Sequence, residues 1–382
     1  MSSCKYLIVI GGPTASGKTS FAIKIAQYFN TDIISCDSRQ FYREMSIGTA
    51  KPSSEELAEV KHHFIDSLSI HDNYSVGDFE QQTIELLDQL FLSRDYVVMC
   101  GGSGLFINAV CFGLDKFPDI PNEIRKQVEE EFDTGGVEKL QAELQSSDPE
   151  YYNEVDLMNP HRLMRALEVI RHTGKPFSSF RRGKYLKRNF IPVFLQIHHP
   201  RETLYQRINQ RVDLMMQANL LAEVKKLVPH QNLNALQTVG YQELFSFLNG
   251  QSTLENSIDQ IKQNSRRYAK RQITWMRRDG FWKHFRPQET SAAILFISFV
   301  AQNNLVLKTL DLREEKFETE EIYPANSKVM TAAKGDALSG YFVFEIKPKK
   351  NIWHPIEMSM PDEILKEFLQ HEKELLMEEY GK

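Results

Sequence analysis

The chain has 382 residues, of which 41% are hydrophobic and 25% charged, and its formal net charge at pH 7 is −5. This length allows two or three domains, and the composition is typical of globular proteins. Because no apolar run is long enough to cross a bilayer and no signal-peptide pattern opens the chain, we expect a cytoplasmic protein without membrane contact. The four cysteines lack metal-ligand spacing, which favours reduced thiols: Cys4, Cys36, Cys100 and Cys111.

The first predicted element is a buried strand that leads into a glycine-rich loop. Residues 6–10 form an apolar run, and residues 20–29 carry apolar side chains at helical spacing. Glycines allow backbone N–H groups to converge on an anion, and a helix N-terminus attracts negative charge. We therefore predict a phosphate site in which Lys18 reaches the terminal phosphates and Thr19 holds Mg²⁺. The loop consists of Gly12, Pro13, Thr14, Ala15, Ser16, Gly17, Lys18 and Thr19.

Two further strands end in residues suited to ligand binding. Residues 32–36 lead into Asp37-Ser38-Arg39-Gln40, and residues 96–100 lead into Gly101-Gly102-Ser103-Gly104. In open α/β sheets, ligands bind at the carboxyl ends of the strands. The alternation of strands and amphipathic helices predicts an α/β fold, a P-loop NTPase-like parallel sheet with helices on both faces.

From about residue 115 the pattern changes to helices alone, which predicts a helical insertion over residues 115–189. Separate helices are expected to begin near residues 122 and 137, and a third runs from Asn159-Pro160 to Gly174. A strand resumes at residues 190–198, and long helices follow at 201–227 and 253–278. The predicted α/β core with its C-terminal helices therefore comprises residues 1–114 and 190–290.

Charge is distributed unevenly along the chain. Residues 311–382 contain 10 Lys and Arg against 16 Asp and Glu, whereas segments 161–188 and 262–286 each contain nine Lys and Arg and one acidic residue. Two basic segments in a nearly neutral body indicate binding to a polyanion, RNA or DNA. Residues 291–382 are predicted to form an extra acidic α+β module of unknown role, with strands at 293–297, 305–310 and 341–346 and a helix at 361–379.

The phosphate loop by itself leaves several chemistries open. A motor ATPase or GTPase normally has a strand that ends in an acidic metal ligand, whereas the strand at 96–100 ends in glycine and serine. Asp37 is placed either as such a ligand or as a general base beside a transferred group. A small-molecule kinase and an RNA-binding ATPase fit the same residues. The pairs His62-His63 and His198-His199 lack the spacing of a metal site and are interpreted as surface or packing residues.

Longer motifs narrow these alternatives. The chain closely resembles the bacterial tRNA dimethylallyltransferases (isopentenyl-tRNA transferases) over roughly residues 5 to 285. The resemblance rests on GGPTASGKT at 11–19, DSRQFYREMSIGTAKP at 37–52, GGSGLF at 101–106, NPHRLMRALEV at 159–169, TGKP at 173–176, TVGY at 238–241 and AKRQITW at 269–275.

This resemblance implies transfer of a dimethylallyl group from dimethylallyl diphosphate to N6 of adenosine 37, in tRNAs that read codons beginning with U. The phosphate loop then holds the diphosphate leaving group with Mg²⁺, and Lys18, Thr19 and Arg211 neutralise its charge. Asp37 is the implied general base, and Ser103 stands where the family usually has threonine, near the leaving oxygen. A prenyltransferase that acts on free adenylate is an alternative, and we expect a monomer.

The same resemblance, together with the basic segments, predicts how the anticodon stem-loop of tRNA is bound. The acceptor adenine has to leave its stack and enter the pocket, at a cost of a few kcal/mol. No cysteine follows Cys111, so the C-terminal zinc finger of many eukaryotic relatives is absent. The predicted tRNA contacts are Asp37, Ser38, Arg39, Gln40, Ser103, Arg125, His161, Arg162, Leu163, Met164, Arg165, Gly240, Tyr241, Arg266, Lys270 and Arg271.

Overall fold

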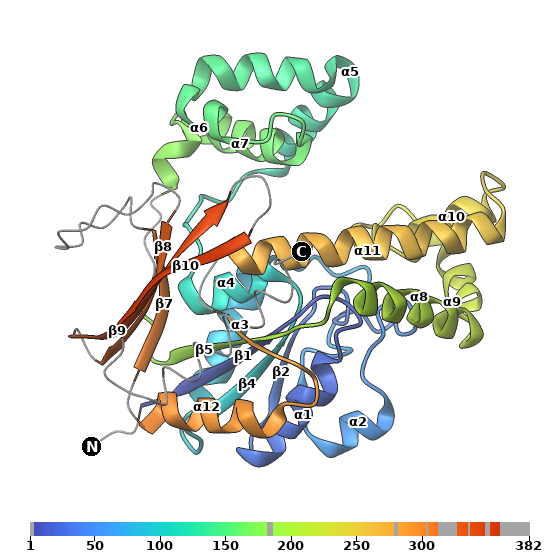
Figure 1. Cartoon of the computed structure of the whole chain (residues 1–382). Helices are drawn as coiled ribbons and strands as arrows, with labels where there is room; N and C mark the ends of the chain where they lie inside the picture. The colour runs from blue at the N-terminus through green and yellow to red at the C-terminus, as the bar shows by residue number, and fades with distance from the viewer. Residues whose placement is uncertain are drawn as a thin grey trace. The chain divides into compact units, whose positions relative to one another are not determined.

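The centre of the computed structural model is a six-stranded sheet in the order β3-β2-β4-β1-β5-β6, in which neighbouring strands pair in parallel (Figure 1). The structure describes residues 4–181, 186–278 and 282–302 and the backbone of strands 305–311, 327–334, 337–347 and 352–359. The sheet confirms the predicted parallel α/β fold. Its strands are β1 (Tyr6–Gly11), β2 (Ile33–Cys36), β3 (His62–His63), β4 (Tyr96–Gly101), β5 (Ile191–Ile197) and β6 (Lys283–Phe285).

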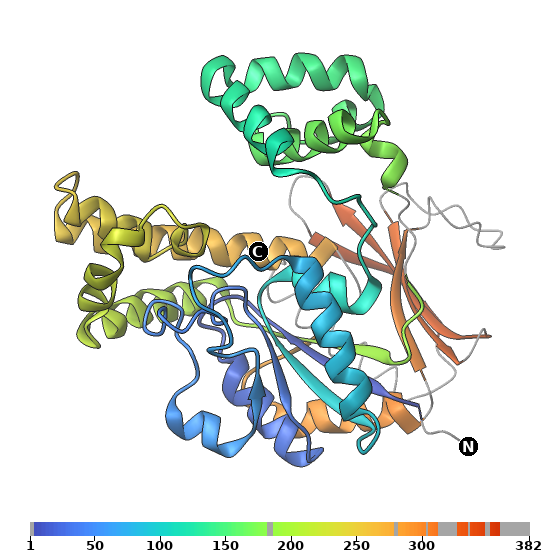
Figure 2. The ribbon, with the colours of Figure 1, turned by 180° about the vertical axis from the view of Figure 1, so that it is seen from behind.

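Helices cover both faces of this sheet. Helices α1 and α12 pack on one face, and α3 and α4 lie on the other, as the front and back views show (Figures 1 and 2). Because the inner strands are covered on both sides, β1 and β2 are buried along their whole length rather than at alternate positions. The helices are α1 (Lys18–Tyr28), α2 (Ser54–Glu59), α3 (Val76–Leu90), α4 (Gly104–Phe112), α8 (Arg201–Gln217), α9 (Leu220–Leu227), α10 (Tyr241–Leu248), α11 (Leu254–Arg278) and α12 (Thr290–Gln302).

The register of the three inner strands brings their carboxyl ends together. Gly101 pairs with Gly11 on one side and with Cys36 on the other, so β1, β2 and β4 end at the same level. A Cβ atom on Gly101 would lie 2.1 Å from the Cys36 carbonyl oxygen, so only glycine fits here. The loops that follow these strands, which carry the phosphate loop, Asp37 and Ser103, are therefore neighbours.

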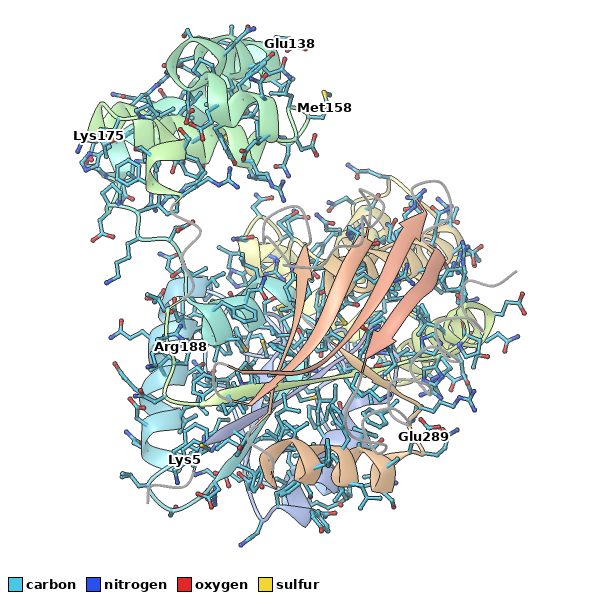
Figure 3. The ribbon with its side chains drawn as sticks, turned by 60° about the vertical axis from the view of Figure 1, so that its left-hand side comes forward. Lys5, Glu138, Met158, Lys175, Arg188 and Glu289 are labelled. Carbon is cyan, nitrogen blue, oxygen red and sulfur yellow. The ribbon has the colours of Figure 1, made fainter. Side chains whose placement is uncertain are left out.

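Residues 112–187 form a compact helical unit of their own. It contains α5 (Asn122–Ser147), α6 (Pro149–Glu154) and α7 (Pro160–Thr173). Asn159 caps α7 through its side chain and Gly174 ends it at φ 68°, as the sequence predicts. The two helices predicted from residues 122 and 137 are confirmed, because Gly136 within α5 has a non-helical backbone, with φ 68° and ψ −170°, and separates a first helix from a second one that begins at residue 137. Glu138, Met158 and Lys175 project outward from this unit (Figure 3).

An ion-pair cluster joins the two longest helices of the unit. Arg171 on α7 donates to the carboxylates of Glu131 and Glu143 on α5. The hydrogen bonds from Arg171 and from Lys139 hold the pKa of Glu131 at about 2, well below its usual range. Of the nine basic residues in segment 161–188, Arg171 is therefore engaged within the protein and not offered to a ligand.

The strand predicted at residues 293–297 is wrong. These residues lie in α12, which buries Ala293, Phe296, Ile297 and Val300 against the sheet and α1. The buried positions follow the three- and four-residue spacing of a helix, which a short apolar run does not reveal by itself. Residues 290–302 consequently pack in the core of the α/β unit, and the extent of the C-terminal module stays a prediction.

The sequence also predicts a helix at 201–227, two strands at 305–310 and 341–346, and a helix at 361–379. The helix predicted over 201–227 breaks at Asn219, whose φ of 71° separates α8 from α9. The strands predicted at 305–310 and 341–346 are confirmed as β7 (Leu305–Asp311) and β9 (Ala337–Lys347), which join β8 (Ser327–Lys334) and β10 (Ile352–Ser359) in an antiparallel sheet. The helix predicted at 361–379 lies outside the described residues. Among the residues that the structure describes, no helix is long and apolar enough to cross a membrane.

Two neighbouring residues of α12 test its place in the core. Phe296 is 1% exposed and Leu295 is 66% exposed. We expect Phe296→Ala to cost about 3–5 kcal/mol in the free energy of unfolding, because it leaves a cavity. Leu295→Ala should change it by less than about 0.5 kcal/mol. Urea denaturation of the full chain measures both, and equal losses would contradict the helical packing.

Candidate active site

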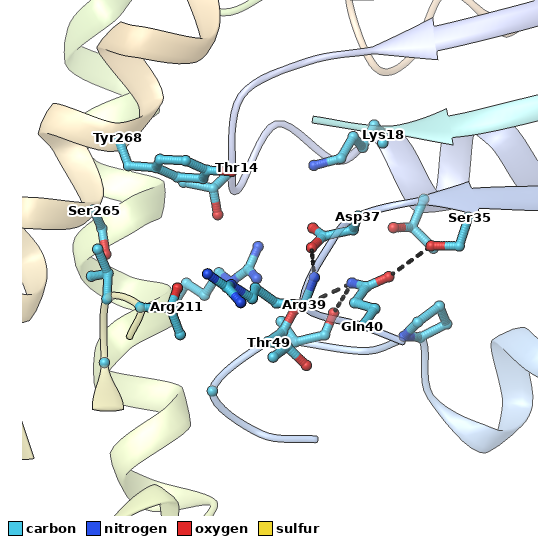
Figure 4. A pocket seen from close by; sticks show the side chains of 18 of the residues that line it. Thr14, Lys18, Ser35, Asp37, Arg39, Gln40, Thr49, Arg211, Ser265 and Tyr268 are labelled. Carbon is cyan, nitrogen blue, oxygen red and sulfur yellow. Dashed lines mark hydrogen bonds between the residues drawn. The ribbon is translucent and has the colours of Figure 1, made fainter. Parts of the chain in front are cut away.

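A pocket opens at the carboxyl ends of β1, β2 and β4, where α8 and α11 form its opposite wall (Figure 4). Eight of the predicted site residues line it, and the structure therefore brings together residues from four distant parts of the chain. They are Thr14, Lys18, Thr19, Asp37, Arg39, Gln40, Arg211 and Gly240.

The phosphate loop is held in shape from its outer side. Ala15 and Gly17 adopt positive φ values of 63° and 85°. Arg207 Nε donates to the Ala15 carbonyl oxygen at 2.8 Å, and His199 Nε2 lies 2.8 Å from the Ser16 carbonyl oxygen. His199 is therefore part of the support of this loop rather than a surface residue. No group of three or more potential metal-binding side chains of His, Cys, Asp or Glu occurs among the described residues.

Two cations face one carboxylate in the pocket. Burial lowers the pKa of Lys18, and it lowers the pKa of Arg211 as well, whereas the charge of Asp37 opposes both shifts. Lys18 Nζ makes a long hydrogen bond of 3.5 Å to the Pro13 carbonyl oxygen. Within the described part of the chain, neither cation forms an ion pair. The pocket is thus electropositive, and an anionic ligand would relieve the cost of burying both cations.

Asp37 begins the turn after β2. Its Oδ1 accepts the Arg39 N–H at 3.1 Å. Ser103 lies beside this turn, because its Oγ accepts the Ser38 N–H at 3.1 Å. Burial and the nearby Asp37 carboxylate raise the pKa of Tyr268 on α11 to about 12, so that its hydroxyl stays protonated. The turn therefore presents a carboxylate, flanked by hydroxyl groups, to the pocket.

Gln40, which the sequence assigned to tRNA, has its side chain engaged inside the protein. Its Oε1 accepts from Ser35 Oγ, and its Nε2 donates to the carbonyl oxygens of Thr49 and Ala50. Gln40 thus holds the loop of residues 46–50, which forms one rim of the pocket. Arg39 similarly donates to the Asn234 carbonyl oxygen at 3.1 Å.

The same rim is clamped by a residue that the sequence analysis missed. Glu223 on α9 accepts hydrogen bonds from the consecutive N–H groups of Ser46, Ile47 and Gly48, at 3.0, 2.8 and 3.0 Å. It also accepts the Tyr241 hydroxyl at 2.6 Å. Nothing in the local sequence around Glu223 signals this role, because its partners lie about 175 residues earlier in the chain.

Two of the predicted tRNA contacts are corrected by burial. Tyr241 and Leu163 are each 0% exposed and belong to hydrophobic clusters of their units, so their side chains offer no surface to RNA. Gly48 has no room for a Cβ, which would lie 2.5 Å from the Tyr241 ring. Tyr241 therefore shapes the pocket rim from behind.

The remaining predicted tRNA contacts lie on two separate units. In the helical unit, Arg125, His161 and Arg162 are exposed, Met164 is half-buried, and Arg165 pairs with Glu168 at 3.1 Å. On α11, Lys270 and Arg271 are exposed, whereas Arg266 donates to Asn209 Oδ1 on α8 at 2.6 Å. Each unit thus presents exposed cations where the sequence predicts them.

Comparison with known proteins shows the family to which this chain belongs. The family model for IPP transferase matches residues 40–279. The tRNA dimethylallyltransferase of Christiangramia forsetii is 53% identical over 289 residues, which are 76% of this chain and 96% of that protein. The chain belongs to the IPP transferase family. About a quarter of this chain has no counterpart in that relative.

Solved structures of the family share the fold. The tRNA isopentenylpyrophosphate transferase from Bacillus halodurans is 34% identical, with a TM-score of 0.58, over 78% of this chain and 97% of that one. A eukaryotic dimethylallyltransferase acting on tRNA is 24% identical, with a TM-score of 0.65, over 83% of this chain and 81% of that one. The likeness to the second structure shows a shared fold.

Loss of the Glu223 side chain should loosen the rim of the pocket. Glu223→Ala leaves three N–H groups without their acceptor, so we expect hydrogen exchange at residues 46–50 to become at least about tenfold faster. The Michaelis constant for the substrate that occupies the pocket should rise. Lys226→Ala, an exposed change on the same helix, is the control and should alter neither quantity. Unchanged exchange in Glu223→Ala would show that the rim does not depend on the clamp.

Proposed function

We propose that this chain transfers the dimethylallyl group of dimethylallyl diphosphate to N6 of adenosine 37 in tRNAs that read codons beginning with U, which yields N6-dimethylallyladenosine. The observation that carries the proposal is the electropositive pocket, in which Lys18 and Arg211 face Asp37, in a chain of the IPP transferase family. Family membership favours this reaction over a small-molecule kinase, which the phosphate loop by itself leaves open.

The donor diphosphate is proposed to bind where the two cations converge. As the bond between C1 of the dimethylallyl group and the bridging oxygen breaks, negative charge accumulates on the leaving diphosphate. Lys18 and Arg211 stabilise that charge, and they act strongly because the pocket is partly shielded from water. Since both cations lack an ion-pair partner among the described residues, they need not break one to bind the donor.

The acceptor amine has to lose a proton as it attacks C1. Asp37 is proposed as the general base, since its Oδ2 forms no hydrogen bond within the described part of the chain while Oδ1 is held by Arg39 N–H. The proton then passes from N6 to Oδ2, and the electron pair of the broken C–O bond leaves with the diphosphate. The Ser103 hydroxyl is held by Ser38 beside this base, which supports the predicted role near the leaving oxygen.

Mg²⁺ is the proposed cofactor. The Thr19 hydroxyl lines the pocket and has no hydrogen-bond partner among the described residues, and the Asp37 carboxylate lines the same pocket. Hydroxyl and carboxylate oxygens are ligands that suit Mg²⁺. Thr19 would hold the ion, which when bound supplies further positive charge toward the diphosphate.

The anticodon stem-loop is the proposed macromolecular partner. Exposed Arg125, His161 and Arg162 of the helical unit, and exposed Lys270 and Arg271 of α11, support this assignment. We propose that the helical unit has tRNA binding as its role and that the chain acts as a monomer in the cytoplasm. Leu163 and Tyr241 are not among the proposed contacts, because their side chains are buried.

The mass of the reaction product tests the proposed function. Purified protein, dimethylallyl diphosphate, Mg²⁺ and an unmodified tRNA with adenosines at positions 36 and 37 should give tRNA that is heavier by one dimethylallyl group. Nuclease mapping should place the group on adenosine 37. Prenylation of free AMP with unmodified tRNA would favour the adenylate prenyltransferase, and transfer of the ATP γ-phosphate would favour a kinase.

Replacement of the proposed base separates chemistry from binding. Asp37→Ala should lower kcat by about 10²–10⁴-fold, the usual contribution of a general base, with little change in tRNA affinity. Asp88→Ala, which removes an exposed aspartate of α3 outside the pocket, is the matched control and should keep the wild-type kcat. Near-normal turnover of Asp37→Ala in a single-turnover assay would remove Asp37 from the mechanism.

The salt dependence of tRNA binding tests the exposed cations. Each phosphate contact releases condensed counterions, so Lys270→Ala and Arg271→Ala should each reduce the slope of log K against log salt by about one unit. Affinity for the prenyl donor should stay the same. Lys225→Ala, an exposed lysine at the end of α9, serves as the control. If all three variants keep the wild-type slope, α11 does not contact the tRNA backbone.

A further inference from the structure

Gln272 lies on α11 where that helix passes the phosphate loop. Its side chain is 6% exposed and lines the pocket. Its Oε1 accepts the Thr14 N–H at 2.9 Å, and its Nε2 donates to the Gly102 carbonyl oxygen at 3.0 Å. One amide therefore joins two loops, which lie 258 and 170 residues away in the sequence.

The chemistry of the two partners determines the orientation of the amide. The Thr14 N–H can only donate and the Gly102 carbonyl can only accept, so a single orientation of Gln272 satisfies both. The space around it is also closed, because a Cβ atom on Gly102 would lie 2.2 Å from Gln272 Nε2. A shorter side chain cannot reach both partners. A carboxylate, whose two oxygens both accept hydrogen bonds, cannot pair with the Gly102 carbonyl oxygen.

The two loops carry the two halves of the proposed reaction. Thr14 belongs to the phosphate loop, which leads into Lys18 and Thr19. Gly102 precedes Ser103, whose hydroxyl accepts the Ser38 N–H beside Asp37. Beyond the strand register, Gln272 therefore joins the loop of the diphosphate site directly to the turn beside the proposed base.

We propose that Gln272 is a positioning residue for prenyl transfer: it sets the distance between the phosphate loop and the Gly101-Gly102-Ser103 turn. This inference rests on the proposed function and names a residue that governs that same site. Gln272 follows directly after Lys270 and Arg271, which are exposed. It therefore also connects both loops to α11, the helix whose exposed cations are proposed to bind tRNA.

Gln272→Met tests the proposal, since methionine has a similar length and volume but makes neither hydrogen bond. The Michaelis constant for dimethylallyl diphosphate should rise about tenfold and kcat should fall about tenfold, whereas the Kd for tRNA should stay within about twofold. Calorimetry with inorganic diphosphate and Mg²⁺ should show the same tenfold weakening without any turnover.

Gln272→Glu adds a signature that loss of packing cannot produce. The introduced carboxylate still accepts the Thr14 N–H but opposes the Gly102 carbonyl oxygen, so diphosphate binding should be weak at neutral pH. At lower pH the protonated carboxyl can donate to Gly102 again. Relative to the wild-type protein at each pH, affinity for inorganic diphosphate should therefore recover as the pH falls.

A destabilised control separates positioning from general stability. Val300 of α12 is 1% exposed and lies in the hydrophobic core of the α/β unit. Val300→Ala weakens this core without touching either loop. It should lower Tm and leave diphosphate affinity unchanged. If Gln272→Met behaves like Val300→Ala, Gln272 is merely structural and the proposal is overturned.

The two proposals fail in different ways. If the wild-type protein binds diphosphate but does not prenylate tRNA, the proposed function falls, and the calorimetric ratio between wild type and Gln272→Met still decides the role of Gln272. If the wild-type protein binds no diphosphate at all, the positioning role is overturned as well.

Discussion

The site depends on one electrostatic constraint, which is that two half-buried cations lie beside a single carboxylate. Burial lowers the pKa of both Lys18 and Arg211, and Asp37 is the charge that opposes this shift at both residues. Such an arrangement is costly in an isolated chain and becomes favourable when an anion enters. A diphosphate supplies that anion, and its departure with the electrons of the broken C–O bond is the step that the two cations assist most.

The scaffold around these charges is polar, and it keeps loops rather than helices in place. Gln272 joins two loops from α11, Glu223 holds the rim from α9, and Arg207 supports the phosphate loop from α8. Each contact uses a side chain to satisfy backbone groups that no regular structure would pair. The pocket is consequently preorganised, which spares the enzyme part of the cost of ordering these loops when its substrates bind.

The parts of this architecture that depend on local spacing were predictable. The strand, glycine loop and helix around Lys18 have a local signature, and so do the caps of α7 at Asn159 and Gly174. Contacts between residues that are far apart in the sequence have no such signature. The roles of Gln272 and Glu223 could therefore not be predicted. Tyr241 was assigned to tRNA because its motif resembles the family, but a motif does not reveal whether a side chain points inward. The five-residue apolar run at 293–297 fits a strand or a helix equally well, and only the buried positions of α12 decide between them.

The central claim is that Lys18 and Arg211 are reserved for the diphosphate of a prenyl donor. The most direct measurement is calorimetric titration of inorganic diphosphate with Mg²⁺ into the wild-type protein, Lys18→Met, Arg211→Met and the double variant. We expect each single variant to weaken binding by at least about tenfold, and the double variant to abolish it, because each cation makes a charge-assisted contact. Equal affinity in all four proteins would contradict the claim.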